Sequence, residues 1–286
     1  METNTLRAII NIKNFNKNDF DDIYPSNNEI STKNRINSVG DSLEFFIKDA
    51  YSNGFSIVNK DEHYANYFSF FGSKNHPPDA IVKHGDAIEV KKTGSFRGDI
   101  QLNSSYPKSK LFSNNPLITN ACRICEDNWD EKDMVYVFGI MTGKVLESLL
   151  FLYGDCFAAE SRIYEDLKDN ITTYLENSND ASEFSETNEI GRLNNVDPLK
   201  ITNLRIRGMW LLRNPYLIFE DYIQKNSNSD FTVCSIVLKN KFDSFPEEDK
   251  KIIIDDEDIK YKEIRIKNPN NPAQFLDAIL IRYDRL

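Results

Sequence analysis

Residues 77–92, PPDAIVKHGDAIEVKK, decide how the surrounding chain folds. Their pattern predicts a β-hairpin with a first strand over Ala80–Lys83 and a second strand over Ala87–Lys92. Between the strands, His84–Asp86 form a turn in which Gly85 is free to adopt a positive φ. The two prolines at the start favour extended backbone before the first strand. We therefore expect the rest of the fold to be organised around this hairpin.

Alternation along the second strand separates charged side chains from apolar ones. Successive side chains of a strand point to opposite faces, so we expect Glu89 and Lys91 on one side and Ile88 and Val90 on the other. Asp79 lies at the mouth of the first strand. The hairpin then brings two carboxylates and one lysine into a single site while the apolar pair enters a core.

These residue types suit metal-assisted hydrolysis of a phosphate ester. Carboxylates are hard oxygen ligands for Mg²⁺, which also takes substrate phosphate as a ligand. A lysine beside the metal can orient an attacking water and offset the charge that builds on the phosphate. The alternative is a solvated surface hairpin, because Asp, Glu and Lys are common on exposed strands. The apolar residues at alternate positions of the strand favour a catalytic site over a solvated hairpin. Further polar residues on either side of the hairpin, which are candidates for the same site, favour it as well.

The composition is that of an ordinary globular protein. The 286 residues are 40% hydrophobic and 28% charged, which suits one domain over residues 1–286 with an acidic loop or insertion at 176–195 and a C-terminal portion at 216–286. No apolar run approaches the roughly 20 residues of a membrane span, and we expect no signal peptide, because the first residues show no basic region followed by an apolar stretch. We therefore expect a cytoplasmic protein with no membrane partner. The lone CxxC at Cys122–Cys125 favours free thiols over a zinc site.

Charge is distributed unevenly along the chain. The net charge is −10, which argues against a protein that coats DNA without specificity. Residues 83–123 nevertheless carry seven basic side chains against three acidic ones, and residues 199–216 carry four basic side chains and no acidic one. Residues 176–189 have five acids and no base. The pattern indicates a basic cleft on an acidic body, with ordinary segregation of charge between loops as the alternative.

Helix-like and strand-like segments alternate along the chain, which predicts an α/β sandwich. The periodicity predicts helices over 6–12, 31–52 and 161–175 and strands over 133–141, 145–157, 202–213 and 231–238. Residues 99–123 and 242–258 read as polar or charged loops, and residues 259–286 predict a late strand and helix.

Two basic segments carry the candidate DNA contacts. Asn103, Ser104, Ser105 and Lys108 follow the hairpin directly and suit contacts with phosphates and base edges. Farther along, Arg205 and Arg207 lie two residues apart and are expected on one face of a strand. An ordinary surface loop would have a similar composition, but the position after the charged strand favours a functional role.

With these pieces placed, the chain resembles Type II restriction endonucleases of the PD-(D/E)XK superfamily, and the NgoPII-type family in particular. The stretches that carry the resemblance are 34–40 with Glu44, Pro78-Asp79 with Glu89-Val90-Lys91, 101–108, and Ala121-Cys122-Arg123, within residues 6–215. The resemblance implies a central mixed β-sheet flanked by helices, dependence on Mg²⁺, and a homodimer that cuts double-stranded DNA at a palindrome. It suggests GGCC as that palindrome, a cognate DNA methyltransferase that protects the host, and DNA contact by Arg123.

The leading hypothesis is therefore a Mg²⁺-dependent, site-specific DNA endonuclease. Asp79 and Glu89 would hold the metal with the Val90 carbonyl as a third ligand, Lys91 would position the water, and Glu44 on the first long helix would assist. One alternative is a repair or recombination nuclease that reads DNA shape. Another is a noncatalytic DNA-binding protein in which the same side chains are merely solvated.

Overall fold

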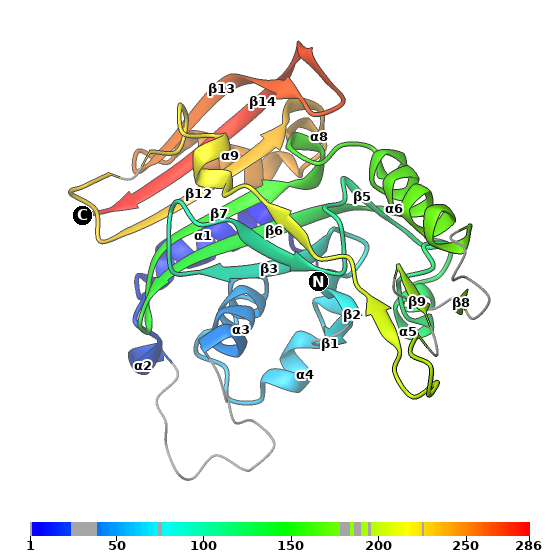
Figure 1. Cartoon of the computed structure of the whole chain (residues 1–286). Coiled ribbons are helices and arrows are strands. Elements are labelled where there is room, and N and C mark those ends of the chain that lie inside the picture. The colour runs from blue at the N-terminus through cyan, green and yellow to red at the C-terminus, as the bar shows by residue number, and fades with distance from the viewer. Residues whose placement is uncertain are drawn as a thin grey trace.

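A mixed β-sheet forms the centre of the molecule (Figure 1). The computed structural model describes residues 2–23, 39–73, 76–177, 184–185, 190–193, 196–224 and 226–286. Within them, a nine-stranded sheet has the order β1-β2-β3-β6-β7-β12-β14-β13, with β5 paired to β6. Its strands are β1 Phe68–Ser73, β2 His76–Val82, β3 Ala87–Thr93, β5 Lys110–Phe112, β6 Glu131–Thr142, β7 Val145–Tyr153, β12 Phe231–Leu238, β13 Ile259–Asn268 and β14 Asn271–Arg285.

The sheet is mixed because two of its pairings are parallel. β3 runs parallel to β6 and β7 runs parallel to β12, whereas the other pairings of the sheet are antiparallel. The central strands are covered on both faces, and β12 is buried along nearly its whole length. The prediction of an α/β protein with a central mixed sheet flanked by helices is confirmed.

Helices cover the sheet and connect its strands. Their bounds are α1 Thr5–Phe15, α2 Phe20–Ile23, α3 Val39–Ser52, α4 Lys60–Tyr64, α5 Asn120–Arg123, α6 Ser161–Glu176, α7 Pro215–Ile218, α8 Lys239–Asp243 and α9 Glu247–Asp255, with a 3₁₀ turn at Gly154–Cys156. The helix α1 begins at the cap Asn4, whose side chain accepts from the amides of Leu6 and Arg7. α3 packs closely on β6, since a Cβ placed on Gly139 would lie 2.6 Å from a methyl carbon of Leu43.

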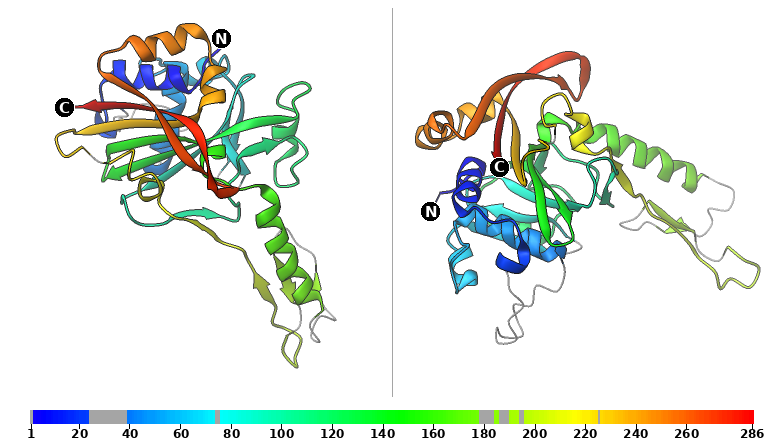
Figure 2. Two further views of the ribbon diagram at one scale, coloured as in Figure 1. Left: turned by 90° about the horizontal axis from the view of Figure 1, so that it is seen from above. Right: turned by 90° about the vertical axis from the view of Figure 1, so that its left-hand side faces the viewer.

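An arm extends from this body. α6 projects away from the sheet in both views of Figure 2, together with the small sheet of β8 Phe184–Ser185, β9 Gly191–Leu193 and β10 Leu204–Ile206. Tyr164 of α6 stacks on Tyr106 with ring centres 5.0 Å apart, and this contact ties the arm to the body. Along the described chain, no helix combines the length and apolarity that crossing a membrane requires.

The C-terminal third differs from the sequence prediction. Residues 242–258 were expected to be a loop, but they contain α9, and residues 259–286 form the antiparallel pair β13–β14 instead of a strand and a helix. In sequence α9 looks like a charged loop because charged residues occupy positions of its buried face. Asp249 is one of them and is buried in an ion pair with Arg7 of α1, while Ile253 is fully buried. β14 reads as a strand only once β12 and β13 pair with its two edges.

Two further predictions need correction, and two fall partly outside the described residues. The segment 99–123 was expected to lack regular structure, but it contains β4 Ile100–Asn103, β5 and α5. The predicted strand 202–213 is two strands, β10 and β11 Trp210–Leu212, separated at residues 207–209. The predicted helix 31–52 is described only from Val39, and most of 176–195 also lies outside the described residues.

Candidate active site

The hairpin β2–β3 brings Asp79, Glu89 and Lys91 together. Its register pairs Ala80 with Ile88, so Asp79 lies opposite Glu89. The amide of Val90 donates a hydrogen bond of 2.7 Å to Oδ2 of Asp79, and Nζ of Lys91 donates one of 2.5 Å to Oε1 of Glu89. Both predicted strands are present, and the bond between Lys91 and Glu89 shows that these two side chains share a face as predicted. The first strand needs correction, because β2 runs from His76 to Val82 and Asp79 lies within it instead of at its mouth. The positive φ of the turn belongs to His84, at 55°, and not to Gly85.

Burial and neighbouring charges shift the pKa values of Asp79 and Lys91. Burial, reinforced by the negative charge of Glu89, raises the pKa of Asp79 to about 7. Burial by itself would lower the pKa of Lys91, but Glu89, Asp79 and Glu44 outweigh it, so the pKa of Lys91 is raised and its ammonium stays charged. Glu44 on α3 therefore lies near enough to act on both groups, as its predicted role requires.

The donor set fits a divalent cation. Oε2 of Glu89 is buried and has no hydrogen-bond partner among the described residues. An unpartnered carboxylate oxygen beside a second, destabilised carboxylate is a position that a cation would satisfy. No group of three or more acidic, histidine or cysteine side chains in the described ranges is arranged to hold a metal by itself. Two carboxylates completed by a backbone carbonyl, water and substrate phosphate match the coordination habit of Mg²⁺.

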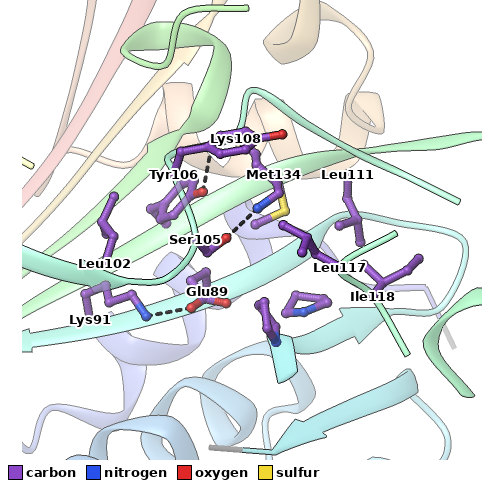
Figure 3. Close-up of a pocket in the computed structure, with 13 residues that line it drawn as sticks. Glu89, Lys91, Leu102, Ser105, Tyr106, Lys108, Leu111, Leu117, Ile118 and Met134 are labelled. Carbon is purple, nitrogen blue, oxygen red and sulfur yellow. Dashed lines mark hydrogen bonds and ion pairs between the residues drawn. The ribbon is translucent and has the colours of Figure 1, made fainter. Parts of the chain in front are cut away.

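Lys108 lies in a pocket next to this site (Figure 3). The pocket is lined by Glu89 and Lys91 on one side and by Ser105, Tyr106 and Lys108 on the other. Lys108 is only 4% exposed, its Nζ donates to the Ser105 hydroxyl, and its ammonium lies 4.6 Å from the centre of the Tyr106 ring. Burial lowers the pKa of Lys108 to about 8. The structure places this lysine inside the pocket beside Glu89 and Lys91, and its predicted role in DNA contact stays a prediction.

The other candidates of this loop differ in exposure. Asn103 and Ser104 are exposed, and Asn103 has a left-handed backbone with φ of 56°. Ser105 is half-buried, and its hydroxyl accepts a hydrogen bond from Nζ of Lys108. DNA could therefore reach the side chains of Asn103 and Ser104, whereas Ser105 lines the pocket.

The three predicted arginines are placed differently. Arg123 uses its guanidinium within the protein, donating to the carbonyls of Ser113 at 2.8 Å and Asn115 at 3.2 Å. Arg207 is exposed just after β10, while the side chain of Arg205 lies outside the described part of the chain. The role of these residues in DNA contact stays a prediction, and for Arg123 the structure shows a loop-bracing role.

Sequence reasoning missed Asn214, which orders the loop after β3. Asn214 is fully buried, and its side-chain amide donates to the carbonyls of Ser95 at 2.9 Å and Gly98 at 3.0 Å. Its side-chain oxygen also caps α7 by accepting from the amide of Tyr216. In sequence the Asn214-Pro215 pair indicates only the end of a strand-like segment, and the local pattern gives no sign of the contact with the distant loop at Ser95–Gly98.

A mixed sheet flanked by helices, with Asp79, Glu89 and Lys91 on its hairpin β2–β3, is typical of a nuclease with a restriction-endonuclease-like fold. Comparison with known proteins agrees. The model of the NgoPII restriction endonuclease family matches residues 3–267. The chain is 38% identical over 283 residues to the Type II restriction enzyme NgoPII of Neisseria gonorrhoeae, covering 98% of this chain and 99% of that protein. No solved structure matches the chain.

The chain therefore belongs to the NgoPII restriction endonuclease family. It is a Type II site-specific deoxyribonuclease, and it binds DNA. The resemblance noted in the sequence is confirmed, and the match reaches farther toward the C-terminus than residue 215.

Proposed function

We propose that the protein hydrolyses both strands of DNA at a short palindrome with Mg²⁺ bound by Asp79 and Glu89, in the manner of PD-(D/E)XK nucleases. The observation that carries this proposal is the convergence of Asp79, Glu89 and Lys91 on one hairpin, with Oε2 of Glu89 buried and unpartnered in the described structure. When bound, Mg²⁺ would stabilise charge on the phosphate and on the leaving 3′ oxygen.

The roles of the side chains follow from their positions. The Val90 amide orients Asp79, and the neighbouring Val90 carbonyl is available as a further ligand. Lys91 keeps its proton and donates from its ammonium, so it can orient the attacking water and stabilise the negative charge that forms on the phosphate. Glu44 adds negative charge from α3, which helps to keep Lys91 protonated.

The test is a cleavage assay on a plasmid of known sequence, with Mg²⁺ and separately with Ca²⁺. Discrete fragments with Mg²⁺, and specific binding without cutting with Ca²⁺, support the proposal. Nicking that follows DNA structure instead of sequence would point to a repair or recombination nuclease. A protein that binds DNA but cuts no substrate with Mg²⁺ would be a noncatalytic binding protein.

We propose GGCC as the recognition sequence, on the basis of family membership. A cognate cytosine methyltransferase is then the functional partner, because a restriction enzyme needs its host DNA protected, and the cytoplasm is where both would act. Mapping of the fragment ends tests this directly. Ends that fall outside GGCC would overturn the sequence assignment while leaving the nuclease assignment intact.

We also propose that the active enzyme is a homodimer. The described residues of one chain place one Asp79–Glu89–Lys91 group on the hairpin β2–β3, whereas a double-strand break requires two phosphodiester bonds to be cut. A two-fold axis shared by protein and palindrome would supply the second site. Sedimentation equilibrium with the cognate duplex and Ca²⁺ tests this, since one chain per duplex would contradict it.

A further inference from the structure

β4 and β11 form a two-stranded antiparallel ribbon that is separate from the nine-stranded sheet. The register pairs Leu211 with Gln101 and Leu212 with Ile100. Ile100 is 3% exposed, and Leu102 on the same inner face is 4% exposed, whereas Leu211 on the outer face is 63% exposed. The ribbon thus has a packed inner face and an open outer face.

The inner face borders the active site. Leu102 lines the same pocket as Glu89 and Lys91 (Figure 3). β3 carries these two residues and ends at Thr93, and β4 begins at Ile100 after a short loop. A duplex whose phosphate reaches Lys91 therefore passes next to the ribbon.

The ribbon is held in place on two sides. Asn214 lies two residues after the end of β11. Its side-chain amide donates hydrogen bonds to the carbonyls of Ser95 and Gly98, which belong to the loop that precedes β4. Trp210 packs edge-on against Tyr164 at 5.5 Å and Tyr106 at 6.1 Å between ring centres. A rigid support of this kind is what precise recognition of a ligand needs.

The outer face carries groups that recognise bases. Continuing the register places Arg213 opposite Asp99, on the same face as Gln101 and Leu211. Arg213, Asp99 and Gln101 are all exposed, and Arg213 makes no ion pair with any residue in the part of the chain that the structure describes. Arginine pairs with guanine O6 and N7, a glutamine amide can donate to the same guanine acceptors or accept from cytosine N4, and a carboxylate accepts from cytosine N4.

We propose that the β4–β11 ribbon enters the major groove of the bound duplex and that Arg213 and Gln101 read base edges there. The major groove is wide enough to admit a two-stranded β-ribbon. The inference rests on the proposed function, since it requires the scissile phosphate to lie at Glu89 and Lys91. It assigns readout to two side chains that the sequence analysis did not single out and to a surface built from segments about 110 residues apart.

The experiment measures binding to a duplex that contains the site cut by the wild type and to a duplex of equal composition with that site scrambled. Binding is measured with Ca²⁺ across a salt series for Arg213→Met, Gln101→Ala and the control Arg265→Met, whose side chain is 70% exposed on β13. Each ribbon variant is expected to lower the ratio of cognate to scrambled affinity by roughly 5- to 150-fold, the range of one base contact. The control should keep the wild-type ratio.

Protection of guanine N7 from dimethyl sulfate gives a second readout, because this atom lies in the major groove. The wild type should protect a guanine of the cut site, and Arg213→Met should lose that protection while Arg265→Met retains it. Equal losses on both duplexes, with a salt slope smaller by about one, would show a phosphate contact and overturn the inference. Unchanged ratios for both ribbon variants would overturn it as well.

The outcome separates this inference from the proposed function. A wild type that cuts at discrete sites while both ribbon variants discriminate as well as it does would leave the nuclease assignment intact and refute the ribbon. A wild type that neither cuts nor discriminates would refute both. Both side chains are exposed, so thermal melting should show that the variants fold normally.

Discussion

Replacing Asp79 by Asn should abolish cleavage and yet stabilise the metal-free protein. Burial and the neighbouring Glu89 raise the pKa of Asp79 to about 7, against an ordinary value of 3.8. The folded protein therefore binds a proton more tightly at this group than the unfolded chain does. Between about pH 4 and pH 7 the contribution of this group to the free energy of unfolding falls as pH rises, because the group has to ionise in an unfavourable place.

The size of the effect follows from the same pKa. The difference between about 7 and 3.8 corresponds to an upper limit of roughly 4 kcal/mol above pH 7, since one pKa unit is 1.36 kcal/mol. An asparagine does not ionise, its oxygen can still accept from the Val90 amide, and its NH₂ can donate to Glu89. The stability gained by Asp79→Asn should therefore grow by roughly 2 to 3 kcal/mol between pH 5 and pH 8.

Urea unfolding in EDTA at pH 5 and pH 8 measures this gain, with Asp221→Asn at an exposed carboxylate as the control. Addition of Mg²⁺ should stabilise the wild type at pH 8 and leave Asp79→Asn unchanged, because only a ligand of the folded state raises the free energy of unfolding. A variant less stable than the wild type at pH 8 would refute the reasoning. So would a gain of the same size at both pH values.

Three further outcomes are expected. Lys91→Met should lower the cleavage rate by roughly 10²- to 10⁴-fold while Ca²⁺-supported specific binding is retained; single-turnover cleavage near the wild-type rate would remove the lysine from the mechanism. Ile88→Asp should unfold the protein, because Ile88 is 1% exposed, and a normal melting temperature would contradict the register of β3. Asp86→Ala should cost about 3 kcal/mol of unfolding free energy in urea, because buried Asp86 pairs with Lys241 at 2.7 Å and accepts from Tyr153 at 2.8 Å; a loss under about 1 kcal/mol would show that this network does not hold the hairpin turn.

The sequence by itself determined the hairpin that carries the site. Alternation of apolar and charged residues over 87–92 sets which side chains share a face, and that is a local property of any strand. The amphipathic spacing of α1 and α6 and the apolar runs of β6, β7 and β12 were equally readable, because each depends on residues close together in the chain. The position of Lys91 beside Glu89 therefore required no knowledge of the rest of the molecule.

Only the tertiary structure decided what lies around the hairpin. The polar segment that became β4 is a strand because β11, about 110 residues later, pairs with it. Lys108 lies in a segment that reads as a polar loop in sequence, but it is buried, and the neighbouring Tyr106 stacks on Tyr164 of the distant helix α6. The charged chain end forms β13 and β14 because each gains a partner along its edge. Pairing and burial of this kind depend on contacts between distant segments, and local pattern carries no information about which distant segment supplies them.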